Sequence, residues 1–257
     1  MTAETSQRLV MSRRGRTGLA DTRLWKSAYL SSGEREALAD AVHTPRVLDA
    51  NADLLREGDS TDSLFLLVEG WACRYTTTGD GSRQIAGLAV PGDVVNLDSL
   101  LLDRIDYGVR VIRRATVLTL ARDRALALAA ERPGIARAFT WLALVENATL
   151  GKWALCLGRR SSRERLAHLF CELSLRLGGE NGNESGFELP LTQEHLADAL
   201  GLTPVHVNRV MQQLRVEGLV STASRVMTIP DVARLRRVGE FDGRYLHLNQ
   251  EAPAPVA

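Results

Sequence analysis

Apolar residues recur with helical spacing between Leu191 and Val220, where the sequence predicts two short helices joined by a tight turn. Thr192 can cap the first helix, and His195 stands where a capping box has Glu, so half of the box is present. Gly201 supplies the residue that ends this helix and turns the chain. Two helices around a glycine turn are typical of a helix-turn-helix, whose second helix enters the major groove of DNA.

The second helix of this pair is predicted to begin at a Thr203 cap, with Pro204 in its first turn, and to end at Gly218. Its apolar positions are Val207, Val210, Met211 and Leu214. The opposite face carries no carboxylate before Glu217, which suits the edges of nucleotide bases. That face comprises Val205, Arg209 and Gln212, flanked by His206, Asn208 and Gln213. The alternative is an amphipathic helical hairpin without a role in nucleic-acid binding.

A second pattern extends from Val47 to about Leu120, where short runs of β-forming residues alternate with glycine turns. The runs cover residues 63–68, 71–77, 83–89 and 109–120. This spacing predicts an antiparallel sandwich or barrel, which can hold one small ligand in its mouth.

A long helix is predicted from Pro133 to about Gly158. Because it is apolar on more than one side, it needs cover on two sides. We expect the barrel on one side and a second copy of the helix on the other, which makes a homodimer. The alternative is a helix buried within one large monomer. The expected dimer seam is Ile135, Phe139, Leu142, Glu146, Thr149 and Trp153, in which the charge of Glu146 needs a partner.

The segment at residues 159–162 interrupts the apolar pattern and is predicted to be a hinge. Ser162 can cap a helix from Arg163 to Leu177, which would be the third helix that the helix pair needs. A polar loop is expected at residues 178–186. Short strands at 187–189, 219–221 and 226–229 predict a wing, and a last short helix is expected at 230–238.

Composition changes this picture in three ways. The net charge of +1 is no general nucleic-acid signature, so DNA-binding charge is expected to be local. Cys73, Cys156 and Cys171 lie far apart in the sequence and predict neither a disulfide framework nor a metal site. No apolar run reaches about 18 residues and no signal-peptide core is present, so we expect a reduced, cytoplasmic protein without a membrane partner.

Four sequence runs resemble the Crp/Fnr family of bacterial transcription regulators. They are SRERLA at Ser162–Ala167, LTQEHLADALGLTPVHVNRVMQQLRVEGLV at Leu191–Val220, PGD at Pro91–Asp93 and FDGRYLHL at Phe241–Leu248. The resemblance covers about residues 24–248. It implies a homodimer that binds double-stranded DNA at a palindromic promoter site and contacts RNA polymerase. We expect no enzymatic activity, because the predicted barrel holds no histidine for a metal-dependent reaction.

The expected fold is α+β, with an N-terminal antiparallel jelly-roll β-barrel like a cyclic-nucleotide-binding domain, a long dimerisation helix and a winged helix-turn-helix. The expected divisions are a disordered tail at 1–22, the sensor barrel at 23–132, and the dimerisation helix and hinge at 133–160. The DNA-binding domain then covers 161–239, and a C-terminal tail covers 240–257.

The resemblance also suggests contacts with DNA. Arg209 matches the family's guanine-reading arginine, while Val205 replaces a frequent Glu and can pack on a thymine methyl group. The expected base contacts are Val205, His206, Asn208, Arg209 and Gln212. The expected phosphate contacts are Thr192, Gln193, Thr203 and Arg225.

The barrel departs from relatives that bind a cyclic nucleotide, in which a Gly-Glu pair and an Arg-Ser or Arg-Thr pair hold the ribose and the phosphate. The matching segments here are Asn96–Ser99 and Asp106–Gly108, and neither Arg104 nor Arg110 fits the spacing. We therefore expect no cyclic nucleotide.

No cysteine precedes Cys73, so we expect no Fe–S cluster, and a lone strand cysteine is more often core than a haem ligand. A small-molecule effector at the barrel or the long helix stays open. So do a constitutive DNA binder and a sensor whose winged helix contacts other proteins.

Overall fold

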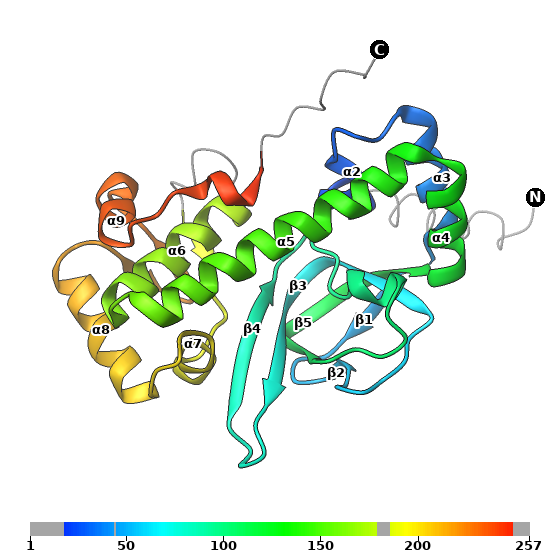
Figure 1. Ribbon diagram of the computed structural model, residues 1–257. Helices are drawn as coiled ribbons and strands as arrows, with labels where there is room; N and C mark the ends of the chain where they lie inside the picture. Colours follow the sequence, from blue (N-terminus) through cyan, green and yellow to red (C-terminus); the bar gives the residue numbers. More distant parts are fainter. Residues whose placement is uncertain (1–17, 44, 179–185, 249–257) are drawn as a thin grey trace, which may run out of the picture. The chain divides into compact units, whose positions relative to one another are not determined.

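The computed structural model describes residues 18–43, 45–178 and 186–248, and the chain divides into two compact units (Figure 1). The first unit holds residues up to Arg74 together with Leu88–Leu144, and the second holds Tyr75–Gly87 and Val145–Asn249. The predictions for residues 1–17, for the loop at 179–185 and for the chain end from 249 lie outside the described residues.

A five-stranded sheet lies mainly in the first unit, while residues 75–87, which cover parts of two of its strands and their connection, belong to the second. Its strands are β1 (Arg46–Leu48), β2 (Asp53–Leu55), β3 (Ser63–Thr77), β4 (Arg83–Ala89) and β5 (Gly108–Ala121). The order is β1-β5-β3-β4, and β2 also pairs with β5. Strands β1 and β2 run antiparallel to β5, with Val47 opposite Thr116. The predicted jelly-roll fold is confirmed, although hydrogen bonds do not close the sheet into a full barrel within the described residues.

Strand β3 joins two runs that the sequence predicts as separate strands at 63–68 and 71–77. Gly70 does not form a turn between them, but continues the strand with a φ of +83°. A Cβ atom at this position would collide with the backbone of Arg114 and Ala115 on β5. Glycine is therefore required by close approach of two strands and by its φ angle.

Helices surround this sheet within the first unit. They are α2 (Arg23–Lys26), α3 (Ser32–Ala41), the short 3₁₀ helix η1 (Leu97–Leu100), α4 (Arg122–Glu131) and the beginning of α5 (Pro133–Arg159). Leu19 is only 1% exposed and belongs to the same core as Leu38 and Phe139, and Thr22 caps α2. The prediction of a disordered tail up to residue 22 is therefore wrong for residues 18–22, because Leu19 has a core to enter.

The second unit contains the predicted winged helix-turn-helix, which is confirmed. Its elements are α6 (Ser162–Gly178), β6 (Phe187–Glu188), α7 (Gln193–Leu200), α8 (Pro204–Val216), β7 (Ser221–Ala223), β8 (Val226–Thr228), α9 (Val232–Val238) and the 3₁₀ helix η2 (Gly243–Leu246). Helix α6 contacts α7, α8 and α9, and so supplies the third helix. The wing is a sheet in the order β6-β8-β7, with both pairs antiparallel.

Residues 241–246 belong to this unit, contrary to the predicted C-terminal tail from residue 240. Tyr245 and Leu246 are buried, and the Tyr245 hydroxyl donates to Glu172 Oε2 on α6 at 2.7 Å. Trp153 Nε1 donates to the same oxygen at 3.0 Å, and Arg176 Nη1 donates to Glu172 Oε1 at 3.1 Å. The fully buried carboxylate thus has three donors, as a buried charge requires.

Helix α5 turns the predicted dimer seam toward the chain's own core. Ile135, Phe139 and Leu142 are buried in the first unit, and Trp153 is buried in the second. Of the other two seam residues, Thr149 is half-buried and donates to the carbonyl of Val145, and Glu146 is half-buried. The prediction is therefore wrong for the four buried residues, because a helix that is apolar all round gives no sign of which side meets its own chain.

Among the described residues, no helix combines the length and the apolar character needed to cross a membrane.

Candidate nucleic-acid interface

Helix α7, the first helix of the helix-turn-helix, begins with a complete capping box. Thr192 Oγ1 accepts from the backbone N–H of His195 at 3.1 Å, and His195 Nδ1 accepts from the N–H of Thr192 at 3.2 Å. Burial lowers the pKa of His195, which favours the neutral ring that this acceptor role needs. The predicted half box is thus complete, with histidine in the place of Glu.

The turn and the start of α8 follow the sequence prediction. Gly201 ends α7 in the left-handed conformation, with a φ of 61°. Thr203 caps α8 by accepting from the backbone N–H of His206 at 3.2 Å, and Pro204 occupies the first turn. Thr192, Gln193 and Thr203 are all exposed at the two helix N-termini. Exposed N–H groups and hydroxyls at such ends favour anions such as phosphate.

Helix α8 divides into the two predicted faces. Val207, Val210, Met211 and Leu214 are buried against the rest of the unit. Val205 is 81% exposed, although it is apolar, and Asn208, Arg209 and Gln212 are exposed beside it. His206 is half-buried and lies between Ser162 and Arg209. The structure thus brings the predicted base-reading residues onto one helix, while the contacts with bases remain a prediction.

The C-terminal end of α8 is held by ion pairing. Glu217 pairs with Arg163 of α6, and this hydrogen bond lowers the pKa of the Glu217 carboxyl. Gln213 Nε2 donates to the other oxygen of Glu217 at 3.0 Å, and Arg234 donates to its backbone carbonyl at 3.1 Å. Gln213 therefore has a structural partner at this end of the helix.

The tip of the wing is a tight turn between β7 and β8. Ser224 and Arg225 occupy it with φ angles of 49° and 67°. Such positive angles are adopted most readily by glycine, asparagine and aspartate. Arg225 is exposed at this tip. Two left-handed residues are the usual geometry of a two-residue hairpin turn, so the tip presents the cation of Arg225 on a turn of ordinary shape.

The beginning of α6 differs from the prediction by one residue. Ser161, not Ser162, caps the helix: its N–H donates to Glu164 Oε2 at 2.7 Å, and its Oγ accepts from the Glu164 N–H at 3.4 Å. This leaves the hydroxyl of Ser162 available for a contact outside the helix, and it lies 2.9 Å from His206 Nε2. The sequence does not distinguish two adjacent serines as caps.

The two barrel segments that match the phosphate-holding pairs of cyclic-nucleotide binders are joined to each other. Tyr107 donates from its hydroxyl to Asp98 Oδ1 at 2.7 Å, and burial raises the pKa of Tyr107, so the hydroxyl keeps its proton. Arg110 donates to both oxygens of Asp53 at 2.7 and 3.1 Å. Arg104 donates to the carbonyl of Gly58 at 2.8 Å. Arg104 and Arg110, which lie near these segments in the sequence, thus pair with other groups.

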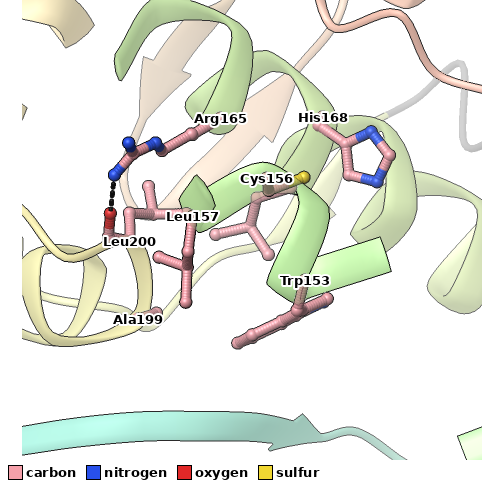
Figure 2. A pocket seen from close by; sticks show the side chains of 8 residues that line it. Trp153, Cys156, Leu157, Arg165, His168, Ala199 and Leu200 are labelled. Carbon is pink, nitrogen blue, oxygen red and sulfur yellow. Dashed lines mark hydrogen bonds between the residues drawn. The ribbon is translucent and has the colours of Figure 1, made fainter. Parts of the chain in front are cut away.

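A small cavity lies in the second unit beside the end of α5 (Figure 2). Arg165 lines it and donates to the carbonyl of Leu200 at 2.8 Å, the bond drawn in Figure 2. The space left for the centre of a water molecule is about 10 Å³, which is too small for an organic effector. Its lining is Trp153, Cys156, Leu157, Arg165, His168, Leu169, Ala199 and Leu200.

The three cysteines are buried, and they form no disulfide within the described residues. Burial raises the pKa of the Cys171 thiol to about 12, so this thiol stays protonated. Within the described ranges, no group of three or more His, Cys, Asp or Glu side chains could hold a metal ion.

Comparison with known proteins agrees with this architecture. Residues 164–238 match the Crp-like helix-turn-helix domain, and residues 45–132 match the cyclic nucleotide-binding domain. The transcriptional activatory protein AadR of Rhodopseudomonas palustris is 31% identical over 189 residues, which are 74% of this chain and 76% of that protein. The nitrogen fixation regulation protein FixK of Bradyrhizobium diazoefficiens is 29% identical over 218 residues, 84% of this chain and 91% of that protein. The solved structure of FixK2 from Bradyrhizobium japonicum superposes with a TM-score of 0.70 at 24% identity, over 76% of this chain and 96% of that one.

Proposed function

Because the chain belongs to the Crp/Fnr family of DNA-binding transcription regulators, we propose that it acts as a homodimer that reads a palindromic promoter site. Each copy would place its α8 in the major groove, with the two half-sites about 34 Å apart. We propose no enzymatic activity, and since its partner is chromosomal DNA, the protein acts in the bacterial cytoplasm.

The exposed face of α8 carries this proposal. Arg209 has the fork of donors that pairs with guanine O6 and N7, and the 81% exposed Val205 suits a thymine methyl group. Asn208 and Gln212 offer amide groups to neighbouring base edges. The exposed N-terminal residues Thr192, Gln193 and Thr203 and the wing residue Arg225 would hold phosphates and fix the register.

A binding-site selection with the wild-type protein and the Arg209→Ala variant tests the proposal. The wild type should select an inverted repeat. The variant should bind it about 1–3 kcal/mol more weakly and lose preference at one base pair of each half-site. Unchanged preference at every position in Arg209→Ala would refute base reading by this residue.

The face of α5 that remains exposed is our proposed dimer seam. Leu144 is 63% exposed, and a Cβ atom at Gly151 would touch nothing. Exposed positions follow alternating steps of four and three residues, the spacing of a coiled-coil seam. They are Thr140, Leu144, Asn147, Gly151, Ala154 and Gly158.

The signal that controls DNA binding is proposed not to be a cyclic nucleotide. The hydrogen bond between Tyr107 and Asp98 ties together the two segments that would hold the ribose and the phosphate. A ligand there would have to break this bond, and Arg104 and Arg110 are engaged elsewhere. The cation beside these segments is Arg74, whose guanidinium carbon lies 5.2 Å from the centre of the Tyr107 ring. Another small-molecule effector at the barrel or the long helix and a contact with RNA polymerase complete the proposal, by analogy with the family. We propose neither a haem nor an Fe–S cluster.

A further inference from the structure

His206 occupies the third position of α8, between the start of α6 and the exposed face of the recognition helix. Its Nε2 atom lies 2.9 Å from Ser162 Oγ and 3.2 Å from Arg209 Nη2. One ring nitrogen therefore meets both a residue of the supporting helix and the side chain proposed to read guanine.

The chemistry of the three groups fixes where the proton of His206 resides. A guanidinium has donors only, so Arg209 can hydrogen-bond to Nε2 only if that nitrogen carries no proton. The neutral ring must then carry its proton on Nδ1. The hydroxyl of Ser162 is available because Ser161 provides the cap of α6. It can turn its own proton toward the same nitrogen, so that the two donors share the single lone pair of Nε2.

We propose that His206 is a positioning residue for Arg209 and does not itself read a base. Ser162 holds the imidazole against α6, and the imidazole holds one arm of the guanidinium while the rest of the fork stays exposed. An arginine that is already held loses less conformational freedom when it binds, and it is aimed at one base position. The inference rests on the proposed role of Arg209 and adds a second residue on which that role depends.

A double-mutant cycle tests the proposal. Wild type, His206→Ala, Arg209→Ala and the double variant are compared in affinity for the selected half-site and for the same site with the guanine replaced by adenine. His206→Ala should reduce the guanine preference about 3- to 10-fold, the effect of one modest hydrogen bond. In the Arg209→Ala background the same change should cost nothing, and the salt dependence of binding should not change.

Matched variants separate positioning from a loss of structure. His206→Gln places an amide oxygen near the Nε2 position and should restore most of the preference, whereas Ser162→Ala should weaken it in the same direction. Val216→Ala, an exposed change near the other end of α8, should leave it unaltered. Nitrogen-15 NMR of the free protein at pH 8 should show the Nδ1–H form of His206, with the Nε2–H form gaining in Arg209→Ala.

Two results would overturn the inference. An equal loss from His206→Ala in both backgrounds, or a salt slope reduced by about 1, means that His206 contacts DNA directly while Arg209 still reads its base. Intact guanine preference in Arg209→Ala removes the base-reading role of Arg209 itself, and the positioning role of His206 with it.

Discussion

At the scale of residues, the polar side chains of the winged helix-turn-helix combine structural and proposed DNA-binding tasks. The hydroxyls of Thr192 and Thr203 accept from helix N–H groups, which leaves their own protons free to be donated. A phosphate oxygen at either helix N-terminus could accept that proton without breaking the cap. Capping and phosphate binding are therefore compatible at these two positions.

The buried His168 should make stability depend on pH. Burial, reinforced by Arg160, lowers its pKa from 6.5 to about 4. In the unfolded chain the ring gains a proton near pH 6.5 while the folded ring stays neutral, so stability is complete above that pH and falls as the pH drops toward 4. Between pH 7.5 and 5 the wild type should lose about 1–2 kcal/mol more than His168→Gln in urea unfolding. Parallel losses in the two proteins would contradict this assignment.

Helical periodicity was enough to predict which residues of α8 are exposed, because one face must be buried and its residues are apolar. It could not predict the partners of individual polar groups. Histidine is an unusual member of a capping box, so the sequence predicts the cap by Thr192 but not the hydrogen bond that His195 accepts in return. The contact between Ser162 and His206 joins residues 44 positions apart, which no local pattern reveals.

At the scale of elements, the wing turn combines unfavourable backbone angles with a cation. Arg225→Gly should relieve a left-handed residue and stabilise the protein by up to about 1 kcal/mol. It should also weaken DNA binding and reduce the slope of log K against log salt by about 0.9, the effect of one phosphate contact. Thermal unfolding and binding at several salt concentrations measure the two effects.

Ser224→Gly is the matched control for the wing, since it removes a similar backbone angle and keeps the charge. It should stabilise the protein and leave the salt slope unchanged. If Arg225→Gly also left the slope unchanged, Arg225 would be a solvated turn residue.

Elements that depend on long-range packing were the ones the sequence predicted poorly. A glycine between two β-forming runs often marks a turn, but Gly70 instead lets β3 pass close to β5. Residues 241–246 precede a stretch rich in Pro and Ala, and the sequence analysis assigns them to the same tail. Phe241, Tyr245 and Leu246 are nevertheless large and apolar enough to indicate a buried segment. Their partner, Glu172, lies 73 residues before Tyr245.

At the scale of the whole molecule, two faces of α5 should respond differently to mutation. Leu144→Arg places a charge on the exposed face, where a second copy would bring an identical charge opposite it. The dissociation constant of the dimer should rise at least about tenfold. The urea concentration at the midpoint of monomer unfolding should change little. Analytical ultracentrifugation measures the association.

Phe139→Ala provides the comparison, because Phe139 is 6% exposed in the core of its own unit. It should lower the free energy of unfolding by about 3–5 kcal/mol, as cavity-forming changes do. Unchanged association in Leu144→Arg would show that the copies meet elsewhere. Sequence periodicity predicted that two faces of α5 need cover, but only the folded chain shows which face is buried within its own copy.

The position of Tyr245 over Glu172 also has a practical consequence for gene design. A stop codon at position 241 would strip a donor from a carboxylate that has no access to water. Such a shortened product is expected to be a substrate for cellular proteases, even though every side chain proposed to contact DNA is still encoded. Reporter fusions and affinity tags therefore belong after Leu248.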